Sequence, residues 1–415
     1  MLNKDFLIKK FRLEKYRIDL RRFKEFSQGE GISFILLFIS SFILNKSLPK
    51  SGLGEFSYYS NLILFLYPLF SLNLADGYNR FLSGENFDRL LVVRLVRKLS
   101  IAATFIMFTV IYLLSSSLEI SSLAFIIIYY ERLNYYRARI LTKVYRKLKV
   151  FHALVVLFGV LYLLHFNIVN FLSALLVYGI SYIIVSAFGF LLDKEKNEGS
   201  RRGKEVLTLS KILKYTVPVM CSSMVLWLLN FSDQHFIRIY YSPTQLGEYS
   251  ISYRALNILR MVTGFFLIYW PILYFREAEQ KNFKKLFNIR KIFMGLIILI
   301  TIVSIIFSDF LYLLIGAGKY IEFTIYFKVL IISELFRIIA GIFMTYRSFK
   351  LETYYNLFIV LFVSLVNILL NYLFLETSGI IFAAYSTLIA TFLYFLLAVV
   401  FSSIPERKFY LRNKS

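Results

Sequence analysis

Five basic residues lie within long apolar stretches of the sequence: Arg238, Arg254, Arg260, Lys328 and Arg337. A charged side chain at the centre of a lipid bilayer costs at least about 2.5 kcal/mol unless it faces a cavity or a partner. The guanidinium group of arginine binds carboxylate and phosphate groups through two parallel hydrogen bonds. These residue types in this setting predict a polar cavity, inside a membrane protein, that binds an anionic group.

Further polar residues accompany these cations at helical spacing. Arg254, Asn257 and Arg260 recur every third residue and share one arc of a helix. Glu334 and Arg337 lie one turn apart, so their side chains can pair. The other candidates for the lining of this cavity are Asp233 and Gln234 near Arg238, Glu131 and Arg132 in an earlier apolar stretch, and Arg80 in a basic segment. Together they predict polar stripes, net positive in charge, on several membrane helices.

Structural roles stay open for some of these residues. The alternatives are packing ion pairs for Glu334 with Arg337 and for Asp233 with Arg238, and extension to the membrane surface for Arg238 and Lys328. Arg254 and Arg260 have no acidic residue nearby in their own stretch. That isolation favours a binding role for these two arginines.

The elements that must position these residues are membrane helices. The chain of 415 residues is 58% hydrophobic, against roughly 45–50% in soluble domains. Twelve apolar spans are predicted at 29–48, 56–76, 97–116, 118–137, 150–167, 169–192, 212–238, 245–275, 291–313, 320–346, 353–373 and 378–402. Each is close to the length of about 20 residues that crosses a bilayer as a helix. The sequence predicts an all-α membrane protein with about twelve transmembrane helices.

Cysteine and histidine are scarce in this chain, which argues against most metal and redox sites. The chain has one cysteine and three scattered histidines, which argues against disulfides, redox pairs and a histidine metal cluster. The segment Gly316–Lys319 lacks the spacing of a phosphate-binding loop and is expected to be a turn. We therefore expect no metal, no cofactor and no ATPase activity.

Basic residues are distributed unequally between the segments that join the spans. Of the 48 Lys and Arg residues, 40 fall in one alternating set of segments that includes both termini, five fall within spans, and three fall in the other loops. Basic loops stay on the cytoplasmic side of a membrane. Both termini are therefore predicted to be cytoplasmic, in an inner (plasma) membrane. The basic runs are read as topology signals and contacts to anionic lipids, so nucleic acid is not an expected partner.

Two similar halves are predicted along the chain. The expected parts are a basic segment 1–28, a six-helix bundle 29–192, a cytoplasmic linker 193–211, a second six-helix bundle 212–402 and a basic tail 403–415. Residues 1–28 are expected to form a weakly amphipathic helix at the membrane surface. Three echoes, expected in the same span of each half, pair 53–57 with 246–250, 112–114 with 312–314, and 145–149 with 346–350. Six spans per half give a parallel repeat with a cavity between the halves.

The stretch Leu48–Tyr59 and its continuation Phe70–Arg80 resemble the Wzx-type polysaccharide flippases of the MOP superfamily, relatives of MATE exporters and of the lipid II flippase MurJ. The shared pattern is a Leu-Gly turn, a span, and a loop that runs from a glycine to an arginine. In the second half, Asp233, a second Leu-Gly turn and Pro271, which is expected to end the eighth span, also fit. The similarity covers about residues 29–402.

This resemblance implies a transporter rather than an enzyme. Its cargo would be undecaprenyl-pyrophosphate-linked oligosaccharide repeat units, moved by alternating access from the cytoplasmic to the outer face for O-antigen (lipopolysaccharide), capsule or exopolysaccharide assembly. The arginines would bind the pyrophosphate, while Asn, Gln, Ser and Tyr side chains suit sugar hydroxyls. Implied partners are membrane lipids, a polymerase and other polysaccharide-assembly proteins, and a coupling ion, proton or sodium.

Two other functions fit the span count. A MATE-like antiporter of small molecules or ions is one, although cationic drugs prefer acidic cavities and these spans carry more basic than acidic residues. A membrane polysaccharide polymerase is the other. Such an enzyme would usually have a long outer loop, and the predicted outer loops are short.

Overall fold

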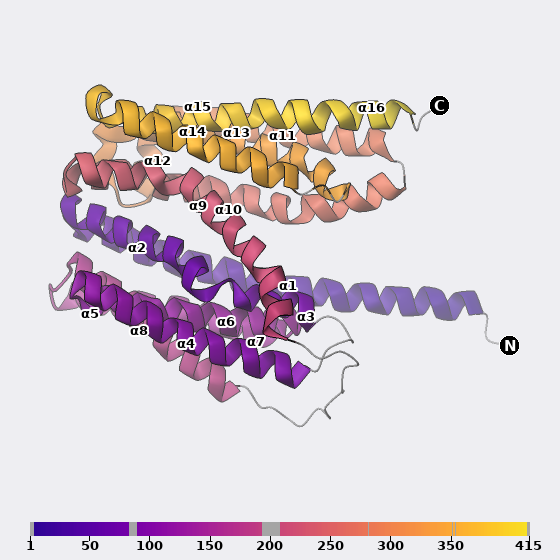
Figure 1. Ribbon diagram of the computed structural model, residues 1–415, viewed down its shortest axis with the longest axis horizontal. Coiled ribbons are helices and arrows are strands. Elements are labelled where there is room, and N and C mark those ends of the chain that lie inside the picture. Colours follow the sequence, from indigo (N-terminus) through magenta and orange to yellow (C-terminus); the bar gives the residue numbers. More distant parts are fainter. Residues whose placement is uncertain are drawn as a thin grey trace. The chain divides into compact units, whose positions relative to one another are not determined.

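The structure is a computed structural model that describes residues 4–82, 89–192, 208–280, 282–350, 352 and 354–412. Over these residues every regular element is a helix, and there is no strand. In Figure 1 the long helices run lengthwise beside one another within each part of the chain. The all-α prediction is confirmed.

Long helices account for each of the twelve predicted spans within the described residues. In the first half they are α1 (Lys4–Ser47), α2 (Lys50–Ser71), α4 (Arg89–Ser115), a broken span made of α5 (Leu118–Ser122), a 3₁₀ turn (Leu123–Phe125) and α6 (Ile126–Ala138), α7 (Thr142–His165) and α8 (Phe171–Leu192). In the second half they are α9 (Leu209–Tyr240), α10 (Pro243–Glu279), α11 (Phe283–Ile306), α13 (Thr324–Phe349), α14 (Tyr354–Ser378) and α15 (Ile381–Ala398).

Short elements join these helices. They are a 3₁₀ turn (Leu74–Asp76) and α3 (Gly77–Phe81) after α2, α12 (Ser308–Leu314) and a 3₁₀ turn (Gly318–Phe323) after α11, and a π-helical turn (Val399–Ser403) followed by α16 (Ile404–Arg412) after α15. The segment from Gly77 to Arg80, which was expected to be a loop, therefore lies in the short helix α3. The expected turn at Gly316–Lys319 is present, and Gly316 has φ 75°.

Eight helices of the described chain are long and apolar enough to cross a membrane by themselves. The remaining spans, α2, α5–α6, α10 and α13, do not meet this criterion of length and composition. They are the second and fourth spans of each half. Because charged side chains avoid lipid, Glu131 and Arg132 of α6, Arg260 of α10 and Glu334 of α13 predict that these helices turn their charged residues to the protein interior.

Several helices extend beyond their apolar cores into basic segments. For example, α7 begins at Thr142, whereas the span was predicted from 150, and α10 continues to Glu279 with Pro271 inside it. The prediction that Pro271 ends the eighth span is wrong. Lys and Arg are good helix formers, so the helices do not stop where hydropathy falls.

The expectation that the third echo falls in the same span of each half is also wrong. Residues 145–149 lie at the start of the fifth span, α7, whereas residues 346–350 lie at the end of the tenth, α13.

The basic N-terminal segment is not a separate element. One helix runs from Lys4 to Ser47 without a break at residue 28. The location of its basic part at the membrane surface stays a prediction. α1 packs on α7: Thr142 donates to Glu25 at 2.7 Å and Arg146 to Gln28 at 2.8 Å. A Cβ on Gly29 would lie 3.0 Å from the Arg146 backbone, so the two helices are in close contact there.

The chain forms two compact units. Unit 1 comprises residues 1–47 and 62–221, and unit 2 comprises 48–61 and 222–415. The core of unit 1 gathers Tyr78, Leu133, Leu148 and Val185. Unit 2 has one core around Val363 and Ala390 and another around Trp270 and Ile338. By its contacts, the first part of α2 therefore belongs with the second half of the sequence.

The C-terminal tail closes one end of unit 2. Glu406 in α16 is fully buried, accepts from Tyr274 at 2.6 Å, and pairs with Arg290 at 2.5 Å. Phe409 and Tyr410 pack against Phe283. The predicted basic tail 403–415 thus includes a helix, Ile404–Arg412, whose side chains pack into the fold as far as Tyr410.

Candidate functional site

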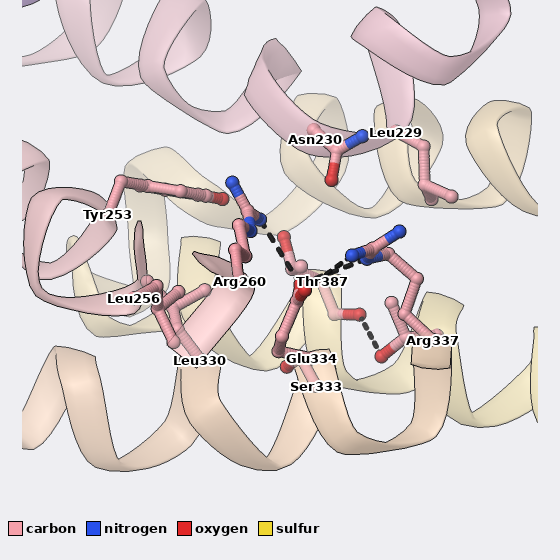
Figure 2. A pocket seen from close by; sticks show the side chains of 11 residues that line it. Leu229, Asn230, Tyr253, Leu256, Arg260, Leu330, Ser333, Glu334, Arg337 and Thr387 are labelled. Atoms are coloured by element: carbon pink, nitrogen blue, oxygen red, sulfur yellow. Dashed lines mark hydrogen bonds and ion pairs between the residues drawn. The ribbon is translucent and has the colours of Figure 1, made fainter. Parts of the chain in front are cut away.

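A polar pocket lies within unit 2, between α9, α10, α13 and α15 (Figure 2). Its lining contains apolar residues and a group of charged and hydroxyl side chains, which are Asn230, Tyr253, Arg260, Ser333, Glu334, Arg337, Thr387 and Thr391. Its cavity volume is about 10 Å³, which is about the space for one water molecule. A larger ligand therefore requires the surrounding side chains or helices to move apart.

Glu334 is the centre of the charged group. Its side chain is 3% exposed and its carboxylate accepts from Arg260 Nη2 at 3.1 Å and from Arg337 Nε at 2.9 Å. Arg337 makes a second bond to the same carboxylate. In Figure 2 the two arginines approach Glu334 from opposite sides. The three side chains form an Arg–Glu–Arg triad with a formal charge of +1.

The triad extends the predicted pair of Glu334 and Arg337. Arg260 comes from α10 and also lies over the Tyr253 ring, with its guanidinium carbon 5.8 Å from the ring centroid. The interpretation of Arg260 as a cation without an acidic neighbour is therefore wrong, because its acid comes from α13. The sequence showed no sign of this contact, since the two residues are 74 positions apart.

Asp233 lies in a neighbouring network of hydroxyl and amide groups. Its buried carboxylate accepts from Tyr249, from Tyr253 at 2.6 Å and from Thr387 at 3.5 Å. Thr387 also accepts from Asn367 Nδ2 at 3.3 Å. Tyr253 and Thr387 line the pocket as well, so the network adjoins the triad.

A pairing of Asp233 with Arg238 is not present. Arg238 instead pairs with Glu55 of α2 at 2.8 Å and lies over the Tyr58 ring. The two residues are five apart on α9, a spacing that turns them to opposite faces of a helix. Arg238 therefore has a partly buried acidic partner, and its own side chain is 34% exposed.

Two more predicted residues contact the first part of α2. Gln234 accepts from Asn61 at 2.7 Å, and Arg254 donates to Ser57 at 3.3 Å. The Arg254 guanidinium also lies over the Phe56 ring, 5.1 Å from the centroid. These residues of unit 2 thus form a band between α2, α9 and α10, outside the pocket.

Asn257 and Lys328 are not brought into this site. Asn257 is exposed and Lys328 is partly exposed, and neither lines the pocket. The arc shared by Arg254, Asn257 and Arg260 is wide, and α10 turns its members toward different surroundings. Spacing alone could not separate them.

Unit 1 holds a second charged cluster. Glu131 and Arg132, both 1% exposed, form an ion pair, and Tyr78 donates to Glu131 at 2.5 Å. The Arg132 guanidinium lies 4.4 Å from the Phe190 ring centroid, and Arg97 lies over the same ring. The side chain of Arg80 lies outside the described part of the chain.

Sequence reasoning missed the aromatic, acidic and hydroxyl partners of these residues. They are Glu55, Tyr78, Tyr249, Tyr253 and Thr387. Tyrosines are abundant in this chain, 31 in all, so no single one was distinctive. The spacing of Tyr249 and Tyr253, one helical turn apart, was the one available signal.

No protein-family model and no curated protein matches this sequence. Solved structures do match the fold. An inward-facing multidrug resistance transporter of the MATE family, in the MOP superfamily, aligns with a TM-score of 0.72 at 9% identity, over 90% of this chain and 94% of its own. The lipid II flippase MurJ, in an inward closed conformation, aligns with a TM-score of 0.65 at 16% identity, over 90% and 86%.

The chain has the MOP transporter fold. It is a multi-pass membrane protein with about twelve long helices. A third match with the MOP fold is a transporter from Pyrococcus furiosus, described as having a binding pocket of reverse polarity that suggests a different function (TM-score 0.61, 12% identity, 93% of this chain and 94% of that one). A shared fold does not determine the cargo, which has to be argued from the site.

Proposed function

We propose that this protein moves undecaprenyl-pyrophosphate-linked oligosaccharide units from the cytoplasmic to the outer face of the inner membrane by alternating access. The cargo would serve O-antigen, capsule or exopolysaccharide assembly. The single observation that carries the proposal is the convergence of Arg260 and Arg337 in one partly open pocket of a MOP-fold protein.

Charge and arginine geometry support a pyrophosphate at this place. The triad carries a formal +1, and arginine forks match phosphate oxygens in geometry. The pocket has the space of about one water molecule, so its side chains would have to move apart to admit the charged headgroup, and the sugar would lie elsewhere. Unit 1 has a second charged cluster, which is formed by Glu131, Arg132 and Arg97.

The network around Asp233 is our candidate for the coupling ion. It places a buried carboxylate beside the oxygens of Thr387 and Asn367. Oxygen donors of this kind suit a hard cation such as sodium, and a carboxylate can also take a proton. Contact of Tyr253 with both Asp233 and Arg260 would link ion and cargo.

A second candidate is export of small molecules, as in the MATE transporter that the chain resembles in fold. The net positive triad argues for an anion rather than a cationic drug. The genetic test separates the two functions. Deletion of the gene should trap undecaprenyl-linked repeat units on the cytoplasmic face, and Arg260→Ala should do the same at normal protein abundance. Normal surface polymer in the deletion strain would contradict the proposal.

Arg254 supplies a comparison within the same helix. It contacts α2 outside the pocket, so Arg254→Ala should impair export less than Arg260→Ala. Arg260→Lys should retain part of the export, because lysine keeps the charge but loses the fork.

A further inference from the structure

We infer that Glu334 is an internal substitute for a pyrophosphate group: its carboxylate holds Arg260 and Arg337 in the unloaded pocket and gives up these bonds when a pyrophosphate binds. The identity of the cargo rests on the proposed function. The inference itself concerns how the pocket holds its ligand and lets it go.

The geometry places the arginines on the open side and the acid beneath them. Glu334 is 3% exposed, whereas the side chains of Arg260 and Arg337 are 24% and 28% exposed. The arginines come from different helices, α10 and α13, and both bind this carboxylate (Figure 2). An anion that enters the pocket therefore reaches the guanidinium groups before it reaches the acid.

The donors of Arg260 are not fully used by Glu334. One nitrogen, Nη2, donates to the carboxylate, while the buried Nε has no hydrogen-bond partner among the described residues. A buried donor without a partner is unfavourable. A phosphate has more acceptor oxygens than a carboxylate and can use both nitrogens, so it can compete for this arginine.

The carboxylate of Glu334 would help the pocket to release its cargo. A transporter must bind its cargo strongly enough to load and weakly enough to unload. Two arginines without an acid would carry +2 and hold a pyrophosphate tightly. With Glu334 in place, each binding event must first break two charged contacts, and each release restores them.

The test is a binding titration of inorganic pyrophosphate, without divalent metal, to the full-length protein in phosphatidylcholine nanodiscs. Glu334→Gln removes the competing charge and should bind pyrophosphate about tenfold to a hundredfold more tightly than the wild type, since a hydrogen bond to a charged group contributes about 1.5–3 kcal/mol. Adding Arg260→Gln to Glu334→Gln should abolish the gain. Glu376→Gln makes the same change of net charge at an exposed position of α14 and should bind like the wild type.

A fold check accompanies the titration. If Glu334→Gln does not remain folded, Glu334→Asp keeps the charge but shortens its reach, and it should also bind pyrophosphate more tightly. Affinities of the folded Glu334 variant within twofold of the wild type would overturn the inference.

Two further arms distinguish the sources of phosphate and the two proposals. In nanodiscs that contain phosphatidylglycerol, an unchanged gain supports pyrophosphate, whereas loss of the gain would assign the pocket to membrane lipid and overturn the inference. Polymer export by cells is measured separately. Normal export by the deletion strain would refute the proposed function, while tighter binding by Glu334→Gln would still support the inference for another cargo that bears a pyrophosphate.

Discussion

Gly54 and Gly247 face each other reciprocally at the crossing of α2 and α10 within unit 2. A Cβ on Gly54 would lie 2.0 Å from the carbonyl oxygen of Pro243, four residues before Gly247, and a Cβ on Gly247 would lie 2.0 Å from that of Lys50, four residues before Gly54. The two glycines belong to the Leu-Gly-Glu echo of the two halves. The repeated motif is therefore explained by a contact that both copies make with each other.

Substitution of either glycine tests this crossing. Gly54→Ala or Gly247→Ala must push the helices apart, because the contact is with backbone, and overpacking costs about 1–3 kcal/mol. Thermal unfolding of the purified protein should show a lower midpoint for both. A Cβ on Gly341 would meet nothing within 4 Å, so Gly341→Ala is the control. Equal midpoints for all three variants would contradict the crossing.

The Arg–Glu–Arg triad predicts which charge deletions the protein tolerates. Glu334→Leu with Arg337→Leu removes one ion pair but leaves Arg260 without its acid. The double variant should therefore be less abundant in the membrane than the triple variant that also has Arg260→Leu, because a partly buried ion that loses its partner is destabilising. Immunoblots of membrane fractions measure this. Abundance of the double variant equal to that of the wild type would mean that Arg260 is independent of Glu334.

Asp233 should determine any stabilisation by a coupling ion. If its network binds a cation, the unfolding temperature of the wild type should be higher in sodium salt, or at acidic pH, than in choline salt at neutral pH. Asp233→Asn should remove this difference. Asp309→Asn changes an exposed acid at the start of α12 and serves as the control. Stabilisation of Asp233→Asn by the same ions would place the ion elsewhere.

The α16 helix should contribute to the stability of unit 2. Glu406→Ala leaves Arg290 buried without its acid, a change that costs about 3–5 kcal/mol. Detergent-solubilised protein should unfold at a clearly lower temperature than with Glu376→Ala, a change at an exposed residue. If both variants unfold at the same temperature as the wild type, the ion pair of Glu406 and Arg290 does not anchor α16.

The charge distribution predicts that residue 200 and the C-terminus lie in the cytoplasm. A cytoplasmic reporter fused at either position should be active, and a periplasmic reporter should be inactive. The cause is the excess of Lys and Arg in the segments that contain these points. Activity of the periplasmic reporter at either point would reverse the predicted orientation.

The helices could be predicted from the sequence because their apolar stretches are long, but their ends could not. Helices continue through basic residues, as in the first turns of α7 after Thr142, and through Pro271 in α10. Arg260, Glu334 and Arg337 were predicted as site residues, yet the bond between Arg260 and Glu334 depends on how α10 packs against α13. Likewise, the pairing of Arg238 with Glu55 rather than Asp233 follows from the packing of α2 against α9. Periodicity reports one helix at a time and contains no information on such contacts.

The unbroken helix α1 extends well beyond its apolar part. Its apolar part is Ser27–Ser47, so the stretch from Lys4 to Phe26 continues the same rod for about 35 Å at about 1.5 Å per residue. A tilt of unit 1 by about 10° would carry the tip of a rod of this length through about 6 Å, while α7 holds its base through Glu25 and Gln28. A spin label near residue 4 would magnify a motion that is hard to detect among the membrane helices.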